Sequence, residues 1–372
     1  MRITSVRTRL VDVDLPAPFH PAWAPGATVT RIRLCYLRID TDAGLYGIAG
    51  HEFFGAEEQA VQRIATYLVG EDPLRIEKHA ATLRYFWPYF GAAVWFVELA
   101  LWDLLGKAAG LPVYKLLGGA FRTKVQPYAT GFYRIKGQGE AKRLGDEAVR
   151  HFEAGFALMK VKLGYGVDDD IACMKEIGRV IQGKPITLMV DTNHAYGRAE
   201  AHRLGRALEE YDLRWYEEPV VPEDVQGYVE MRQKLSMPIA GGENEHTLYG
   251  FREFLNAGAV DVAQPDLGSC GGISAGRHII ALAQSHGIQV NPHVWGSAIA
   301  QAASLQLIAA LPVAHHSLFA LEPVLEYDRS THPFRQYLIT KPIQQVQGWV
   351  ELPSGPGLGV EVDRAVLEKF RV

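Results

Sequence analysis

The chain has 372 residues, 48% of them hydrophobic and 22% charged, and a net charge of −4. This length exceeds what one ordinary hydrophobic core holds, and it suits a barrel of roughly 250 residues with an accessory domain. The slightly acidic balance, without a basic run, argues against a nucleic-acid partner. A disulfide framework or a zinc cluster is not expected, because the cysteines are few and scattered. They are Cys35, Cys173 and Cys270.

The N-terminal residues alternate charged and apolar side chains and contain no apolar signal core. The most hydrophobic predicted helix, residues 92–105, is interrupted by Glu98 and Asp103, so we do not expect it to span a membrane. We therefore expect a cytoplasmic protein without a membrane partner. We further expect a homo-oligomer that acts on a small molecule.

The N-terminal third predicts an α+β capping domain over residues 1–124. Residues 2–13 and 28–40 alternate in a strand-like way, and a turn at 41–44 leads into a third strand at 45–48. Residues 15–27 contain several prolines, which predicts a long lid loop between the first two strands. Helical patterns follow at 56–69, 72–85 and 91–109. A sheet followed by helices, without alternation, is typical of an α+β domain.

From Val125 onward strands and helices alternate, which predicts a fold of the α/β class. Eight candidate strands end near residues 130, 163, 193, 217, 243, 266, 293 and 322. Intervals of roughly 23 to 33 residues suit parallel strands joined by crossover helices. We therefore expect a modified (β/α)8 barrel, written (β/α)7β, over residues 125–326. The Pro- and Gly-rich segment 327–372 is expected to return to the capping domain.

Three apolar runs each end in an acid, at Asp191, Glu217 and Glu243. The spacing of 26 residues corresponds to one strand, one helix and their loops, so the acids end three successive parallel strands. In a barrel those strand ends meet at one rim. Three ionised carboxylates there repel unless their pKa values rise or a cation joins them, and an all-oxygen site suits Mg²⁺. The alternative is that each acid pairs with a basic residue or caps the following helix.

Two lysines lie on the predicted second barrel strand, Lys160 and Lys162. Residues two apart on a strand face the same side, so both point into the barrel or both point outward. Helices cover the outside of a barrel, which makes the inward direction less costly than burial against apolar helix faces. Two neighbouring ammonium groups close to a divalent cation depress each other's pKa, and a lysine then becomes a usable base.

A second base is predicted across the barrel at His293, which ends the seventh strand. Asp266 ends the sixth strand, and a carboxylate on one ring nitrogen would orient the imidazole and raise its basicity. A lone histidine at a strand end is more often structural, and the neighbouring Asp266 favours the functional interpretation. The predicted eighth strand, residues 316–322, ends in Glu322. This acid could bind the substrate carboxylate, act as an acid, or form a salt bridge to Lys160 or Lys162.

This series of strand-end residues resembles the mandelate racemase subgroup of the enolase superfamily over nearly the whole chain, capping domain included. The resemblance implies that Asp191, Glu217 and Glu243 bind one Mg²⁺ ion. It also implies a base on each face of the substrate, with a further acid on the enolate oxygen. The implied catalytic residues are Lys162 tuned by Lys160, His293 paired with Asp266, and Glu322.

The resemblance also implies residues that contact the substrate. Asn193 corresponds to a position that binds a substrate hydroxyl, and His194 and Trp295 are expected in the wall of the site. The lid residues His20 and Trp23 are more polar than an aromatic-acid pocket requires, which favours a hydroxylated substrate.

Removal of an α-proton from a carboxylate requires groups that meet the developing negative charge. The enolate can then be reprotonated, as in a racemase or epimerase, or expel a β-substituent. Segments such as Glu217–Glu223 and Pro292–Gly296 are similar to D-galactarolactone cycloisomerases, which open a sugar-acid lactone. Acid-sugar dehydratases share the catalytic set, and the residues do not separate the two. Dipeptide epimerases and metal-dependent aldolases fit less well, because the residues that define them are missing. A binding barrel without catalysis also fits less well, because such chains usually lose a base or a ligand and none is missing here.

Overall fold

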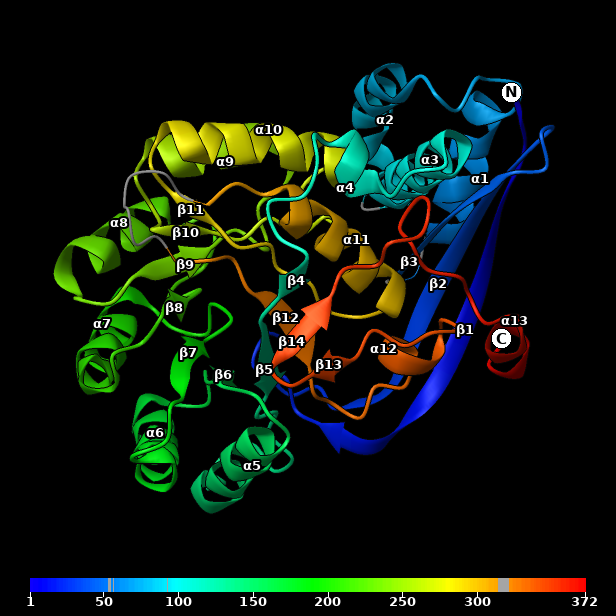
Figure 1. Cartoon of the computed structure of the whole chain (residues 1–372). Helices are drawn as coiled ribbons and strands as arrows, with labels where there is room; N and C mark the ends of the chain where they lie inside the picture. The colour runs from blue at the N-terminus through cyan, green and yellow to red at the C-terminus, as the bar shows by residue number, and fades with distance from the viewer. Residues whose placement is uncertain (53–54, 56, 92, 314–320) are drawn as a thin grey trace.

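The computed structural model describes residues 1–372 except 53–54, 56, 92 and 314–320. An antiparallel sheet in the order β1-β2-β3 begins the chain, and its long β1–β2 ribbon runs down one side of the molecule (Figure 1). Helices pack against this sheet. The elements are β1 (Ile3–Phe19), β2 (Val29–Thr41), β3 (Tyr46–Glu52), α1 (Glu57–Leu68), α2 (Ile76–Phe90), α3 (Ala93–Ala109) and α4 (Val113–Leu116).

The predicted lid loop begins later than expected, because β1 continues to Phe19. The Phe19–Val29 pair closes this ribbon after a register shift that follows Asp14. Pro16 and Pro18 are compatible with the strand because β1 is the edge of its sheet, where a missing N–H leaves no ladder partner unpaired. The prediction of a loop was therefore wrong for residues 15–19, and the lid is the tip of a β-hairpin.

Eight parallel strands form the second sheet, in the order β11-β10-β9-β8-β7-β6-β5-β12. Helices α5–α10 surround these strands in an arc (Figure 1). The gap between β11 and β12 is bridged by Val324 N, which donates to Asn291 Oδ1 at 2.8 Å. The strands are β5 (Pro127–Gly131), β6 (Leu158–Lys162), β7 (Thr187–Asp191), β8 (Tyr216–Glu217), β9 (Ile239–Gly241), β10 (Val262–Ala263), β11 (Gln289–Val290) and β12 (Leu325–Asp328).

One helix follows each of the first seven barrel strands, which confirms the predicted (β/α)7β barrel with its antiparallel cap sheet. None of the described helices combines the length and the apolar character needed to cross a bilayer. The helices are α5 (Ala141–Glu153), α6 (Val167–Ile181), α7 (Arg198–Leu208) with the short 3-10 helix η1 (Glu209–Tyr211), α8 (Val225–Lys234), α9 (Thr247–Asn256), α10 (Gly272–Ser285) and α11 (Ala298–Ala310).

An apolar layer fills the inside of the barrel below the site. Every member except Ala240 lies two positions before a polar residue of the same strand end, so the alternation of strand side chains turns both toward the barrel interior. Leu158, for example, lies on the same face of its strand as Lys160 and Lys162, and all three side chains point to the barrel interior. The layer consists of Tyr128, Leu158, Met189, Trp215, Ala240, Val262 and Val324.

The eighth barrel strand lies further along the chain than predicted. It pairs with β5 from Leu325–Pro127 to Asp328–Thr130. Residues 316–320 of the predicted strand lie outside the described residues, and Glu322 precedes β12. Pro323 separates the two, because it has no N–H to donate to a ladder.

The C-terminal segment contacts both lobes, whereas the predicted domain limits stay a prediction. Its strand β14 (Trp349–Glu351) pairs with β4 (Lys124–Val125) and with β13 (Gln345–Val346). Two short helices follow β12 and end the chain, α12 (Phe334–Tyr337) and α13 (Arg364–Lys369). Beyond α13, the carbonyl of Phe370 accepts a hydrogen bond from Asp12 N of β1 at 2.9 Å.

A buried carboxylate joins the cap helices to the barrel. Glu98 of α3 accepts hydrogen bonds from the backbone N–H groups of Ile273 and Ser274 at the start of α10, both at 2.9 Å. Trp102 Nε1 donates to the same carboxylate at 2.7 Å. Burial raises the pKa of Glu98 to about 7 against the effect of these donors.

Glu98→Ala should lower the free energy of unfolding by about 3 kcal/mol, because two buried N–H groups of α10 lose their acceptor. Urea denaturation measures the loss. Glu77→Ala is the matched control, because Glu77 also reaches α10, but through an exposed ion pair with Arg277 at 3.5 Å. Its effect should stay below about 0.5 kcal/mol. Equal effects of the two substitutions would contradict this role of Glu98.

Candidate active site

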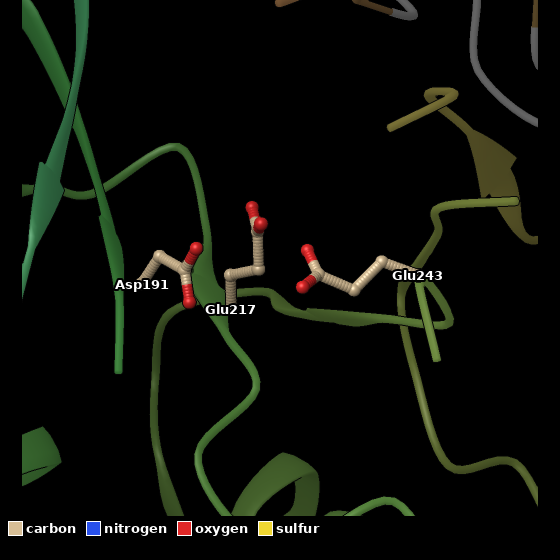
Figure 2. Close-up of side chains that lie close together, drawn as sticks. All are labelled: Asp191, Glu217 and Glu243. Carbon is tan, nitrogen blue, oxygen red and sulfur yellow. The ribbon is translucent and has the colours of Figure 1, made fainter. Parts of the chain in front are cut away.

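Three carboxylates meet at the rim of the barrel, as the sequence predicted. Asp191 ends β7, Glu217 ends β8 and Glu243 follows β9. Each offers one oxygen, and these oxygens lie within 4.8 Å of one another. The side chains form a row that converges on Glu217, the middle member (Figure 2). An arrangement of this kind could hold a metal ion.

The electrostatics of two of the three acids fit a divalent cation, whereas the burial of Asp191 is outweighed by Lys162 and Lys160, which hold its pKa well below the usual value. Burial raises the pKa of Glu217 to about 8 in spite of Lys160. Burial, followed by the neighbouring charge of Glu218, raises the pKa of Glu243 to about 7. The buried Oε2 atom of Glu243 accepts no hydrogen bond from the described residues and has only an ion-pair contact, with His293 Nε2 at 3.3 Å. A cation would relieve the repulsion and supply the missing partner, and oxygen ligands of this type suit Mg²⁺.

Both lysines of β6 point into the barrel, as predicted. Lys160 Nζ lies 2.5 Å from Glu217 Oε1 and 3.5 Å from Asp191 Oδ2. Lys162 Nζ donates to Asp191 Oδ2 at 2.5 Å and to Asn193 Oδ1 at 3.0 Å. The same-side placement therefore brings both ammonium groups to the candidate metal ligands.

The pKa of Lys162 is not depressed by these residues alone. Burial lowers the pKa of Lys162, but Asp191 raises it further than Lys160 lowers it, and the result lies above the usual value. The pKa of Lys160 is also raised, because Glu217 and other acids outweigh its burial. A lysine base near neutral pH therefore needs a further positive charge close to the acids, and a bound cation would provide it.

His293 lies at the other end of the row of acids. Its Nδ1 is 2.6 Å from Asp266 Oδ2, and its Nε2 is 3.3 Å from Glu243 Oε2. Burial lowers the pKa of His293, but Glu243, Glu326 and Asp266 raise it to about 10. Gly268 N donates to the second oxygen of Asp266 at 2.6 Å, which fixes the carboxylate that orients the ring.

The acid expected at Glu322 is located at Glu326. The side chain of Glu322 is 64% exposed and pairs with Arg122 at 2.9 Å, so it does not face the barrel interior. Glu326 Oε1, by contrast, lies 2.9 Å from Lys160 Nζ and accepts a hydrogen bond from Thr130 Oγ1 at 2.7 Å. Burial would raise the pKa of Glu326, but Lys160 and His293 lower it to about 2.

The hairpin tip places an aromatic cover over the site. The Trp23 ring lies 5.5 Å from Lys162 Nζ and 6.2 Å from the Trp295 ring. Tyr133, which the sequence did not single out, contacts both tryptophans, with Trp295 Nε1 donating to its hydroxyl at 2.7 Å. The His20 ring has a different place, because its Nδ1 lies 3.1 Å from Ala27 O of its own hairpin.

The residues expected to contact substrate after β7 have protein partners. Asn193 accepts from Lys162 and donates through Nδ2 to Glu243 Oε1 at 3.3 Å, so it bridges a base and a candidate ligand. The ring of His194 pairs with Glu218 instead of the three acids, with Nδ1 at 3.0 Å from Oε2.

Comparison with protein families gives matches over both lobes. The model described as "Mandelate racemase / muconate lactonizing enzyme, N-terminal domain" matches residues 4–118. The model described as "Enolase C-terminal domain-like" matches residues 143–366, which include every candidate ligand and base.

Named relatives cover nearly the whole chain. The D-galactarolactone cycloisomerase of Agrobacterium fabrum is 37% identical and aligns over 100% of this chain and 99% of the relative. The arabinonate dehydratase of Saccharolobus solfataricus is 30% identical over 90% of this chain and 89% of the relative. Among solved structures, the 3,6-anhydro-D-galactonate cycloisomerase from Zobellia galactanivorans superposes with a TM-score of 0.88 at 32% identity, and both chains are covered completely.

Glu243→Gln should weaken Mg²⁺ binding by at least about 100-fold, because a neutral amide replaces a candidate ligand whose Oε2 accepts no hydrogen bond in the described part of the chain. Isothermal titration calorimetry measures the affinity. Glu245→Gln, two residues further on, is the control for a lost carboxylate near the rim and should bind Mg²⁺ within about twofold of the unaltered protein. Equal affinities in all three proteins would contradict the ligand set.

Proposed function

Because the chain belongs to the mandelate racemase/muconate lactonizing enzyme family and is therefore an enzyme of the enolase superfamily, we propose that it opens a sugar-acid lactone with the help of Mg²⁺. The substrate is a galactarolactone-type compound that carries a free carboxylate. The observation that carries this proposal is the placement of Lys162 and His293 at opposite ends of the row Asp191, Glu217 and Glu243.

The three acids would hold the cation, one per chain. When bound, Mg²⁺ supplies positive charge that stabilises the second negative charge developing on the substrate carboxylate. Lys160 lies below the row, between Glu217 and Glu326, and its ammonium group pairs with both carboxylates. In this proposal some residues of the site bind or compensate charged groups, and others transfer protons.

The reaction begins when Lys162 or His293 removes the proton from the carbon next to the carboxylate. The electron pair of that C–H bond forms a carbon–carbon double bond to the β-carbon, and the bond from the β-carbon to the ring oxygen breaks. The ring oxygen keeps the electron pair of the broken bond and becomes one oxygen of a second carboxylate of the same molecule. The group on the opposite face, or a nearby acid, returns a proton to the β-carbon as the resulting enol becomes a 2-keto acid, so that the product is an isomer of the lactone. Asp266 orients His293 for this transfer.

Glu326 takes the part that the family resemblance assigned to Glu322. Its Oε1 is bound by Lys160 and Thr130, while Oε2 lies 3.6 Å from His293 Nε2. Glu326 would therefore couple the protonation of His293 to the charge on the oxygen atoms of the substrate. The aromatic cover of Trp23, Tyr133 and Trp295 would exclude water from the enolate.

Dehydration of an aldonate or aldarate is the second candidate, because the arabinonate dehydratase is also similar over 90% of the chain. Both reactions share proton removal and differ in the group that leaves the β-carbon. The full-length similarity to one cycloisomerase and the structural similarity to another favour ring opening. A homo-oligomer, a cytoplasmic location and a substrate contact from Asn193, His20 or His194 stay predictions.

Incubation of the Mg²⁺-loaded protein with D-galactarolactone in D₂O should give an isomeric product without loss of water. ¹H NMR and mass spectrometry monitor the reaction. Lys162→Ala should lower the rate by at least about 1,000-fold, because one proton-transfer group is removed. Parallel reactions contain D-galactonate and D-arabinonate, with semicarbazide detection of 2-keto-3-deoxy products. Turnover of the open-chain acids alone would replace ring opening by dehydration, and no turnover of any of these compounds would contradict the proposal.

Glu326→Gln should reduce kcat by about 100-fold or more, because a charged partner of Lys160 and His293 is lost from the site. Glu322→Gln is the matched control, four residues earlier and exposed, and should leave kcat within about twofold. Steady-state kinetics, with circular dichroism to verify folding, measure both. The reverse order of effects would return the catalytic acid to Glu322.

A further inference from the structure

Glu218 follows a candidate metal ligand and contacts side chains from two other strand ends. Asn244 Nδ2 donates to Glu218 Oε1 at 2.7 Å, and His194 Nδ1 lies 3.0 Å from Glu218 Oε2. A carboxylate only accepts hydrogen bonds, so Nδ1 of His194 carries the hydrogen. The side chain of Glu218 is 1% exposed, so a buried carboxylate lies at the centre of this junction of three loops.

Each member of this junction lies close in sequence to one candidate ligand. The loops that follow β7, β8 and β9 are therefore tied together directly beside the acids they carry. The pairs are His194 with Asp191, Glu218 with Glu217, and Asn244 with Glu243.

The backbone supports the same junction. His194 N donates to the carbonyl of Glu218 at 3.0 Å, and Thr192 Oγ1 donates to the same carbonyl at 2.8 Å. The loops also contain side-chain-bearing residues with left-handed backbone, Asn193 (φ 41°), His194 (φ 51°) and Glu218 (φ 45°). Such conformations persist where surrounding contacts hold them, and they concentrate at functional sites.

We propose that Glu218 is a positioning residue for the metal site: it ties the loops after β7 and β9 to the end of β8 and so keeps the three acids at one separation. This inference rests on the proposed function, in which Asp191, Glu217 and Glu243 bind Mg²⁺. Without the junction, repulsion between the acids would spread the loops apart, and a cation would have to gather its ligands at the cost of their mobility.

Calorimetric titration with Mg²⁺ tests the proposal on the unaltered protein, three single variants and one double variant. Glu218→Ala should weaken binding about 10- to 100-fold, as for other groups that orient metal ligands. Glu218→Gln separates charge from position, because a flipped Asn244 amide can still bond to it, and should weaken binding less than Glu218→Ala. Asn244→Ala should weaken binding by about threefold or more.

Combining Glu218→Ala with Asn244→Ala should cost no more affinity than Glu218→Ala alone, because the second change removes a group that has already lost its partner. Additive losses would overturn the proposal. Equal affinities of Glu218→Gln and Glu218→Ala would overturn it as well, since they would assign the effect to charge.

Mg²⁺ affinity of Glu218→Ala within about twofold of the unaltered protein overturns the role of Glu218 and leaves the proposed function standing. Absence of Mg²⁺ binding by the unaltered protein refutes the proposed metal site and this inference with it. Where Glu218→Ala does not fold, exposed Asn244 carries the test, and unchanged affinity of Asn244→Ala is the overturning result.

Discussion

The rest of the site depends on the ion pairs that the buried ammonium group of Lys160 forms with the surrounding carboxylates. This ammonium group lies between Glu217 and Glu326, with Asp191 at 3.5 Å, and none of these side chains is exposed. Burying several carboxylates in one barrel would be prohibitive without compensating charge, and the loss of one partner from a buried ion pair typically costs about 3–5 kcal/mol. Lys160 compensates the charge of Glu217 and Glu326. Burial nevertheless raises the pKa values of Glu217 and Glu243, and a bound cation would lower them.

The barrel converts this charge pattern into a reaction geometry. Alternation along β6 places Lys160 low and Lys162 at the rim, so that one lysine compensates buried charge and the other faces the mouth. On the far side, Asp266 holds His293 with Nε2 directed to Glu243. Lys162 and His293 therefore flank the three acids from opposite ends, and in the proposed reaction one of them would remove a proton while the other returns one.

Much of this arrangement was predictable, because strand ends of a parallel barrel converge regardless of their separation in sequence. The ligand set, the Lys160–Lys162 direction and the Asp266–His293 pair required only strand positions. The prediction that Glu322 faces the barrel interior was wrong. Two glutamates lie close together near the eighth strand, and periodicity did not show that this strand begins after Pro323. Tyr133 and Glu218 were missed since their importance comes from contacts between different loops, which no local pattern records.

The capping hairpin shows why the prolines alone did not predict the conformation of the lid. Its tip is fixed at both backbone groups of His20, whose N–H donates to Arg134 O at 2.7 Å and whose carbonyl accepts from Tyr165 OH at 2.5 Å. Arg134 is itself fully buried beside Asp170, so the anchor belongs to the barrel. The hairpin therefore carries Trp23 to a fixed place above Lys162, and the histidine expected to touch substrate serves through its backbone. A cover held this way would exclude water from the proposed reaction by its position, and the polar groups of the site come from the residues of the barrel rim.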